Sequence, residues 1–511
     1  MMVGQHGIDL AIDLITTHFG DLVAKVCRCL LKHGPISLQE ISRFTQLSSS
    51  RVKNCLLVLI QHNCIQAFSS PRGSSEKLVT LYAALFNGIL HRMRFPKFLG
   101  IVNDDLGEQC ETLLEGLLQN GRLTFEQLLE RTISKLPEAS ESTRKELRVN
   151  FNKLAHSHYV ERCPKPEPFL VPTSEDQSTR KRGAKTNEQS SPLEQQAATA
   201  AALSYAERFS EIPDIETEAV NFDVGDHHHA LSAGDKRKYE ALEIDQELES
   251  TITENEVLWR ANYEKFVYCL KKKACASNVR ARLGLDAGII LEAMVEANGQ
   301  EKVGTKNSVT SSMNIILERV REKPGGIAMT LEHIRVVLDQ LNSHSSTDDA
   351  GALYSIDLNK IIEACQNDEV EALVQARYGQ EAYRIFRLLV KSGHPIETDR
   401  IAEVTFVEKK DAQLILYKLW KDEYLDMEKV TLHVSGPAQL SFWKLNKKAL
   451  WEHILDDMYH AALNLSQKIS HIVEQQHEVS RDTERQLLRR KIILQQSLLK
   501  LDDALMLFHD F

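Results

Sequence analysis

An internal repeat constrains the fold of this chain more than any other feature of its sequence. Three segments share the order of an apolar helix, a glycine, a short extended pair and a hydroxyl residue that can begin a second helix. Glycine after a helix takes left-handed backbone without a Cβ clash, and serine or threonine caps the free N–H groups of the next helix. The glycines are Gly34, Gly121 and Gly393, and the capping candidates are Ser37, Thr124 and Thr398, with Glu40 and Gln127 placed to complete capping boxes in the first two.

Each repeat continues with a helix that carries its apolar residues on one face. The stripe residues are Val52, Cys55, Leu56, Leu59 and Ile60, then Leu147, Phe151, Leu154 and Ala155, then Ala412, Ile415, Leu416, Leu419 and Trp420. Extended segments follow at Ile65, Val160 and Leu425, and the first of them reads as a β-hairpin with a Gly/Pro/Ser tip. Helix, strand, helix, helix and hairpin is the order of the winged helix, a helix-turn-helix variant.

A fourth, less regular copy is expected between residues 257 and 356. Val257, Trp259 and Tyr263 are expected to open a helical stretch, and Thr330 is placed to cap a later helix. Residues 352–356 are expected to form a strand. One helical stripe is predicted from Val309, Met313, Ile316, Leu317 and Val320.

Two regions depart from this pattern. Residues 172–252 are polar and predict a disordered linker, with a short helix possible near Ala197–Arg208. Its basic groups, Arg180-Lys181-Arg182-Lys185 and Lys236-Arg237-Lys238, fit a nuclear localisation signal or, equally well, solvated linker charge. From residue 446 onward two heptad-spaced helices predict an antiparallel coiled-coil hairpin, and one continuous helix that pairs with another chain is the alternative. The seam residues are Leu455, Tyr459, Ala462, Ser466, Ile469 and Val473, then Leu494, Leu498, Leu501, Leu505 and Phe508.

The expected fold is therefore mainly α, with four tandem winged-helix domains and a C-terminal coiled-coil hairpin. The expected boundaries are winged helices at 1–93, 94–171, 253–356 and 357–445, the linker at 172–252 and the coiled coil at 446–511.

Composition and motifs limit the function. The formal net charge of −10 argues against a free-standing protein that coats nucleic acid, so DNA contact is expected from local basic faces or within a larger assembly. The nine cysteines contain no CxxC pair, so reduced thiols are expected and no zinc site, and no apolar run is long enough to predict a membrane span. No phosphate-binding, dinucleotide-binding, nucleophile-elbow or metalloprotease motif occurs. We therefore expect no enzyme activity and no cofactor.

Winged helices can place their third helix in a DNA groove and their wing on the phosphate backbone. The candidate residues for phosphate contact are Arg51, Lys53, Arg72, Lys77, Arg144, Lys145, Arg148, Lys409 and Lys410. Each of them taken alone is better explained as ordinary surface charge. Taken together they fit DNA contact by at least one repeat, and that contact is expected to be sequence-independent. Protein docking is the alternative use of such domains.

Several stretches, in the same order along the chain, resemble the third-largest subunit of RNA polymerase III. They are His18-Phe19-Gly20, Val58-Leu59-Ile60-Gln61-His62-Asn63, Arg94-Phe95-Pro96-Lys97-Phe98, Trp259-Arg260-Ala261-Asn262-Tyr263, and Arg377-Tyr378-Gly379 with Arg384-Ile385-Phe386-Arg387. That family is similar to the large subunit of general transcription factor IIE in its tandem winged helices. The resemblance implies a heterotrimer with two other polymerase III-specific subunits, seated on the polymerase clamp in the nucleus. It further implies a non-catalytic role in promoter opening and initiation, with DNA contact near the transcription bubble.

Two other interpretations remain open from the residues alone. A separate initiation factor of the factor IIE type would have the same domains, although the large subunit of that factor carries a zinc ribbon and this chain has no paired CxxC. A winged-helix scaffold outside transcription, such as a cullin or a proteasome-lid subunit, has one such domain after a long helical array. Here the repeat begins near the N-terminus.

Overall fold

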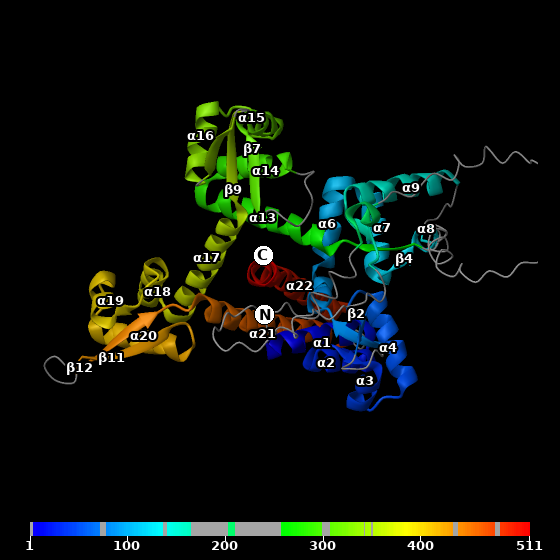
Figure 1. The fold of residues 1–511 in the computed structure, drawn as a ribbon, viewed down its shortest axis with the longest axis horizontal. Coiled ribbons are helices and arrows are strands. Elements are labelled where there is room, and N and C mark those ends of the chain that lie inside the picture. The colour runs from blue at the N-terminus through cyan, green and yellow to red at the C-terminus, as the bar shows by residue number, and fades with distance from the viewer. Residues whose placement is uncertain are drawn as a thin grey trace, which may run out of the picture. The chain divides into compact units, whose positions relative to one another are not determined.

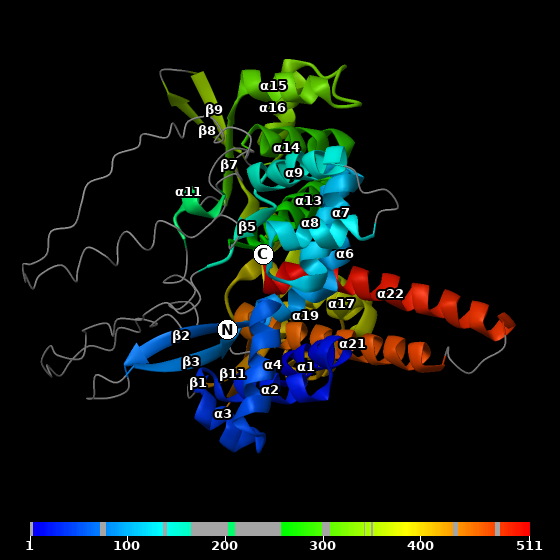
Figure 2. The ribbon, with the colours of Figure 1, turned by 90° about the vertical axis from the view of Figure 1, so that its right-hand side faces the viewer.

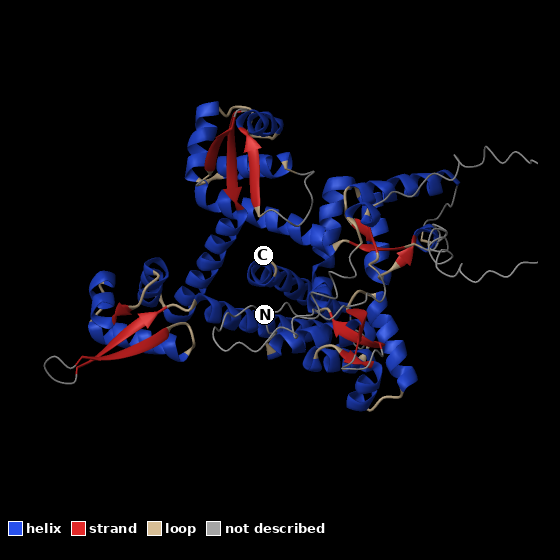
Figure 3. Ribbon diagram, viewed as in Figure 1, coloured by secondary structure: helices blue, strands red, loops and turns tan. Residues whose placement is uncertain are grey.

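The computed structural model describes residues 4–71, 78–135, 141–164, 203–209, 257–298, 307–341, 343–348, 351–432, 438–475 and 481–511. The chain forms two compact units, one made of residues 14–266 and the other of residues 1–13 with 267–511. We call them the 14–266 unit and the 267–511 unit. Within these ranges helices dominate both units, and the strands form four small three-stranded sheets (Figures 1 and 3). The prediction of a mainly α fold with winged-helix domains is confirmed.

The first repeat of the 14–266 unit follows the expected order. Its elements are α2 (Asp21–His33), β1 (Ile36–Ser37), α3 (Leu38–Thr45), α4 (Ser49–Gln61), β2 (Ile65–Pro71) and β3 (Leu78–Ala84). The stripe of α4 is buried except for Ile60, which is partly exposed. The Ser37 N–H donates to Glu40 Oε2 at 3.0 Å, as the predicted capping box requires. In the sheet, β3 lies between β1 and β2.

The second repeat is closed by a strand that lies far along the chain. Between the first and second repeats lie α5 (Phe86–Leu90), a 3-10 turn (His91–Arg94) and α6 (Phe95–Leu106). The second repeat consists of α7 (Glu108–Asn120), β4 (Leu123–Thr124), α8 (Phe125–Ile133), α9 (Glu141–His156), β5 (Val160–Arg162) and β6 (Leu258–Ala261). β6 pairs with both β4 and β5. The expectation that Val257, Trp259 and Tyr263 open a helix of the third repeat is therefore wrong for residues 258–261. The expected domain boundary at residue 253 would assign β6 to the third repeat, although β6 pairs with strands of the second.

The third repeat lies in the 267–511 unit. Its elements are α14 (Leu285–Ala297), β7 (Ser308–Ser312), α15 (Met313–Glu322), α16 (Leu331–Gln340), β8 (His344–Asp348) and β9 (Gly351–Asp357), and α13 (Tyr263–Leu283) precedes it. Thr330 caps α16 as predicted, because its side chain accepts from the His333 N–H. The single stripe from Val309 to Val320 is wrong in part, since Val309 lies in strand β7 and only the later residues are helical.

The last repeat consists of α18 (Gln380–Ser392), β10 (Ile396–Glu397), α19 (Thr398–Thr405), α20 (Lys409–Lys421), β11 (Asp426–Leu432) and β12 (Ala438–Lys444), after α17 (Leu358–Tyr378). Two sequence expectations are corrected here. Glu397, and not Thr398, precedes the first turn of α19; the Thr398 hydroxyl instead accepts from the Trp443 indole N–H at 2.8 Å. Trp420 is 37% exposed and so is not a core member of the stripe of α20.

A glycine joins an extra helix to the front of every repeat. Helices α1 (Gln5–Phe19), α6, α13 and α17 each end where the first helix of a repeat begins. Gly20, Gly107, Gly284 and Gly379 have φ of 84°, 89°, 100° and 89°, with ψ near 180° in all four. This combination is essentially restricted to glycine. Each glycine N–H closes the preceding helix and each carbonyl accepts from the following one, so the repeated element contains four helices.

The C-terminal helices α21 (Lys447–Gln475) and α22 (Arg481–His509) form an antiparallel hairpin and lie side by side in Figure 2. The Tyr459 hydroxyl meets His509 Nδ1 at 2.9 Å, which places the end of α22 beside the first half of α21. A single continuous helix is therefore excluded, while supercoiled coiled-coil packing stays a prediction. Of the seam, Tyr459 and Leu505 are buried, whereas Val473 is 37% exposed and Ile472 is buried in its place.

Candidate nucleic-acid interface

The exposed side of α4 carries the first pair of candidate cations. Arg51 and Lys53 are both exposed, and Val52 between them is fully buried, because successive residues of a helix point about 100° apart. Within the described part of the chain, neither Arg51 nor Lys53 forms a salt bridge. Arg51 lies in the first turn of α4, where the helix dipole adds positive potential, and Lys53 follows in the next turn. The pair can therefore accept a phosphate without breaking an existing contact.

The wing of the first repeat is described only in part. Strands β2 and β3 pair from Ile65↔Ala84 to Pro71↔Leu78. Arg72 and Lys77 lie outside the described residues, as do the basic groups and the His227-His228-His229 triad of the linker.

The candidates on α9 differ from one another. Arg144 and Lys145 are exposed, but the Arg148 side chain is only 18% exposed. Its guanidinium lies 3.9 Å from the Glu126 carboxylate and 5.3 Å from the centre of the Phe125 ring. Arg148 therefore joins α9 to α8, and phosphate binding would compete with that contact.

The last repeat presents a different surface on the corresponding helix. Lys409 Nζ lies 2.8 Å from Asp399 Oδ2, so this cation is already paired, whereas Lys410 is exposed. Beside them Leu414 and Tyr417 are 53% and 54% exposed, and Phe406 in the preceding turn is 91% exposed. The large apolar side chains on this face suit a protein partner, and the exposed Lys410, Lys418 and Lys421 lie on the same helix.

Within the 14–266 unit, a polar joint holds the first two repeats together. The Arg122 N–H donates to the Gln61 carbonyl at 3.0 Å, and Arg122 Nε donates to Asn63 Oδ1 at 2.9 Å. The Gln61 side chain donates to the carbonyls of Asn120 and Arg122. A Cβ on Gly121 would lie 2.0 Å from the Gln61 carbonyl oxygen, so only glycine permits this approach. The joint couples α4, which ends at Gln61, to the second repeat.

This joint was not recognised from the repeat pattern. Its only sequence signal was the stretch from Val58 to Asn63, which the resemblance singled out without a structural role. Trp259, from another such stretch, packs edge-on against Phe151 at 5.1 Å, and Phe98 stacks on Phe266 at 4.6 Å. These stretches therefore contribute the contacts that assemble the 14–266 unit.

A partly buried cation, Arg92, acts on two histidines near this joint. Arg92 lies over the Phe19 ring at 4.5 Å. Burial, followed by the charge of Arg92 and then of His18, lowers the pKa of His62 to about 4. Burial and Arg92 lower the pKa of His18 as well. Both imidazoles are therefore neutral at pH 7 and add no positive charge for a nucleic acid.

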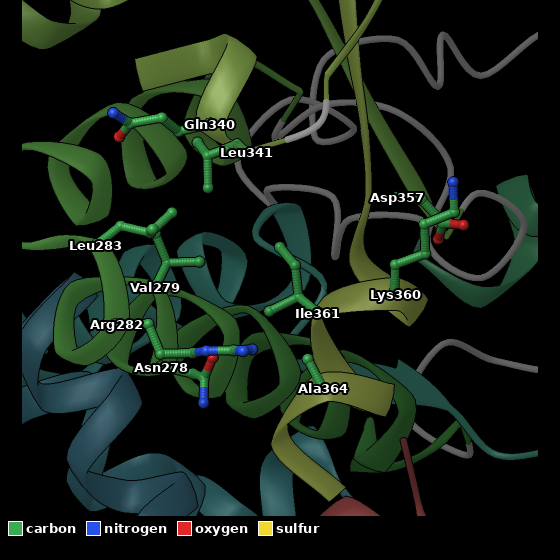
Figure 4. Close-up of a pocket in the computed structure, with 10 residues that line it drawn as sticks. All are labelled: Asn278, Val279, Arg282, Leu283, Gln340, Leu341, Asp357, Lys360, Ile361 and Ala364. Carbon is green, nitrogen blue, oxygen red and sulfur yellow. The ribbon is translucent and has the colours of Figure 1, made fainter. Parts of the chain in front are cut away.

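A cavity of about 410 Å³ lies in the 267–511 unit between α13, α16 and α17 (Figure 4). Apolar side chains from Val279, Leu283, Leu341 and Ile361 line it, together with the polar side chains of Asn278, Arg282, Gln340, Asp357 and Lys360. Arg282 lies 3.6 Å from Asp368, so part of its charge is balanced.

Two further findings concern ligands and membranes. Among the described residues, no group of three or more His, Cys, Asp or Glu side chains is arranged to hold a metal ion. Over the same ranges, no helix combines the length and the apolar character that crossing a membrane requires.

Three models of RNA polymerase III subunit families match successive parts of the chain. The family model described as "RNA polymerase III subunit RPC82 helix-turn-helix domain" matches residues 9–70. The model "RNA polymerase III subunit RPC82" matches residues 149–365, and "POLR3C, C-terminal winged-helix domain" matches residues 370–442.

Relatives named DNA-directed RNA polymerase III subunit RPC3 extend this match. The Homo sapiens protein is 24% identical over 437 residues, which cover 83% of this chain and 76% of the human protein. The Dictyostelium discoideum protein is 22% identical and covers 91% of each chain. The Scheffersomyces stipitis protein is 30% identical over 117 residues, 23% of this chain and 19% of its own length. Family models and relatives agree along the chain, as the resemblance implied: the chain belongs to the RPC3 (RPC82) family of RNA polymerase III subunits.

Proposed function

We propose that this chain is a non-catalytic subunit of nuclear DNA-directed RNA polymerase III that supports promoter opening and transcription initiation. The observation that carries the proposal is the collinear match of three RNA polymerase III family models to the winged-helix repeats. Polymerisation chemistry would belong to other subunits, and this chain would contribute binding surfaces.

The DNA contact is proposed for the exposed side of α4. Arg51 and Lys53 offer two exposed positive charges near the start of a helix, without a salt bridge to any residue that the structure describes. Such charges suit phosphates and read no base sequence. With a net charge of −10 the whole chain repels DNA at long range, so the contact would form only where the polymerase already holds the duplex. Arg144 and Lys145 are secondary candidates, and Arg148 and Lys409 are less favoured because of the ion pairs described above.

The proposed partners are two other polymerase III-specific subunits, with which the chain would form a heterotrimer, and the clamp of the polymerase core. The apolar face of Phe406, Leu414 and Tyr417 supports a protein-docking role for the last repeat.

Affinity purification of the tagged full-length chain, followed by mass spectrometry, tests membership of the complex. Recovery of the polymerase III core and of two further specific subunits in near-equal amounts is expected. Their absence, with the bait intact, would refute the proposal.

The DNA contact is tested with purified polymerase that carries the Arg51→Glu/Lys53→Glu variant. Promoter complexes are expected to dissociate at lower salt than wild-type complexes, and the slope of log K against log[salt] should fall by about 0.9 for each phosphate that the variant no longer neutralises. The control variant Lys448→Glu/Lys468→Glu changes two exposed cations of α21 and introduces the same net charge. Equal loss of retention in both variants would mean that only net charge matters, and no loss would remove α4 from the DNA path.

A further inference from the structure

The second repeat carries a long insertion inside its wing. Strands β5 and β6 pair antiparallel from Val160↔Ala261 to Arg162↔Trp259, and the Cys163 N–H donates to the Leu258 carbonyl at 2.8 Å. The chain therefore leaves the sheet after β5 and re-enters it at β6, at the same end of this strand pair. Within this insertion the structure describes Leu203–Phe209, which we call the docking segment.

The docking segment is helical although it is too short to be stable alone. Helix α11 (Tyr205–Arg208) has four residues, and isolated helices of this length do not form in water. Its start is well formed, since Ser204 and Glu207 make a capping box in which the Ser204 N–H donates to Glu207 Oε2 at 2.9 Å. Contacts with the second repeat must supply the remaining stabilisation. In Figure 2, α11 lies beside β5.

An arginine of the docking segment pairs with a buried acid of the wing. Arg208 donates to Glu161 Oε2 through Nε at 2.9 Å and through a terminal nitrogen at 2.5 Å, and it reaches Glu264 at 3.2 Å. Glu161 on β5 is 3% exposed, and its other oxygen accepts from Arg260 at 2.8 Å. A buried carboxylate is costly unless hydrogen-bonded, so Glu161 strongly favours a second arginine at this position.

Two aromatic residues of the docking segment enclose a histidine of the turn before β5. The Phe209 and His158 rings have centroids 4.2 Å apart, and the Tyr205 ring meets His158 edge-on at 5.4 Å. The Tyr205 hydroxyl lies 3.2 Å from His158 Nε2. The His158 carbonyl accepts from the Asn262 side chain at 2.9 Å, and this hydrogen bond fixes the turn to the end of β6.

We propose that the second repeat has a recognition site for a short helical peptide and that the chain's own docking segment occupies it. The site consists of His158, Glu161, Arg260 and Glu264. The site recognises an arginine with one aromatic residue three positions before it and another directly after it. In the docking segment these residues are Arg208, Tyr205 and Phe209. When the docking segment occupies the site, the insertion is attached to the wing at residues 203–209 as well as at its two ends. This inference does not depend on the proposed role in transcription.

Hydrogen exchange of the full-length chain tests occupation of the site. The amides of Glu207 and Arg208, which donate to the hydroxyl and the carbonyl of Ser204, are expected to be protected in the wild type, although a four-residue helix alone would not be. The Arg208→Ala variant should exchange roughly tenfold faster there or more, because charged hydrogen bonds are lost. Ala206→Ser, at an exposed position of the same helix, should leave protection unchanged. Exchange of the wild-type segment at the rate of an unstructured peptide would overturn the proposal.

A binding experiment tests recognition separately. A fluorescent peptide with the sequence of residues 203–209 is added to the wild-type chain and to the full-length Tyr205→Ala/Arg208→Ala/Phe209→Ala variant. The peptide should bind the triple variant, whose site is vacant, and bind the wild type much more weakly. A peptide with alanine in place of arginine should bind neither. Equal binding of the wild-type peptide to both chains, or binding to neither, would refute a specific site; far-UV circular dichroism confirms that the variant is folded.

Discussion

Replacing Gly107 by alanine is expected to destabilise the 14–266 unit by about 1–3 kcal/mol, whereas replacing Gly100 by alanine should stabilise it by about 0.5–1 kcal/mol. Gly107 joins α6 to α7 with φ of 89° and ψ of 174°, a conformation that a Cβ disfavours. Its N–H donates to the Asn103 carbonyl and its carbonyl accepts from the Glu111 N–H. An alanine that shifts the backbone would therefore weaken both helix ends.

The two glycines form a matched pair. Apart from the adjoining backbone, neither has an atom within 4 Å of the position that a Cβ would occupy, so a clash with other side chains or distant backbone is excluded at both. Gly100 lies at an exposed position inside α6 with ordinary helical backbone, where alanine is the better helix former. The two substitutions thus differ in backbone conformation and not in the space available.

Hydrogen exchange of α6 and α7 in the full-length variants measures both effects. A cost of about 1.4 kcal/mol corresponds to tenfold faster exchange of amides that open by the same local unfolding. Gly107→Ala should accelerate exchange in both helices, and Gly100→Ala should slow it. If both variants changed stability in the same direction and by the same amount, the argument from backbone conformation would be wrong, for Gly107 and for the other three junctions.

Three further predictions concern single side chains. Thr398→Val removes the acceptor of the buried Trp443 indole N–H and should cost about 1–3 kcal/mol in urea unfolding, whereas Thr398→Ser should retain most of the stability. His62 has a pKa of about 4 in the folded chain, below its ordinary value of about 6.5, so the unfolded state binds the proton more readily. The free energy of unfolding should therefore be highest above pH 6.5. It should fall by on the order of 1–2 kcal/mol toward pH 4, after allowance for solvent screening. His62→Gln should reduce that loss in a pH series of thermal unfolding, and an unchanged pH profile would contradict the assignment. Phe406 is 91% exposed with a φ of 54°, so Phe406→Asn should stabilise the fold by up to about 1 kcal/mol and slightly raise the unfolding temperature. A marked loss of stability would show that Phe406 has a structural contact.

Much of each repeat could be predicted because its signals are local. Gly34, Gly121 and Gly393 follow their helices with positive φ, and Thr124 with Gln127 forms the expected capping box. The capping and glycine signals depend on neighbours within one helical turn, and a buried stripe depends on the period of one helix. The repeated junction glycines were less visible, because a lone glycine between helices resembles any other turn. Gly20 and Gly379 stood within stretches of family resemblance, but Gly107 and Gly284 did not.

The candidate site was predictable only as a set of cations. Helical periodicity correctly places Arg51 and Lys53 outside, since a buried Val52 requires its neighbours to point away. It does not reveal that Arg148 is paired with Glu126, or Lys409 with Asp399, because these partners belong to other helices. Whether a surface cation is available for DNA depends on such contacts.

The amino-acid sequence by itself determined the kind of module, its helices and its repetition, because hydrophobic period and cap chemistry act over a few residues. Only the tertiary structure decided which strand closes the second sheet, since β6 is separated from β5 by the whole insertion and pairs through backbone groups that every residue carries. It also decided that Gln61 and Arg122 join two repeats and that Arg208 pairs with Glu161. These contacts form between segments far apart in the sequence, and the residue pattern of one segment does not identify the segment that it contacts.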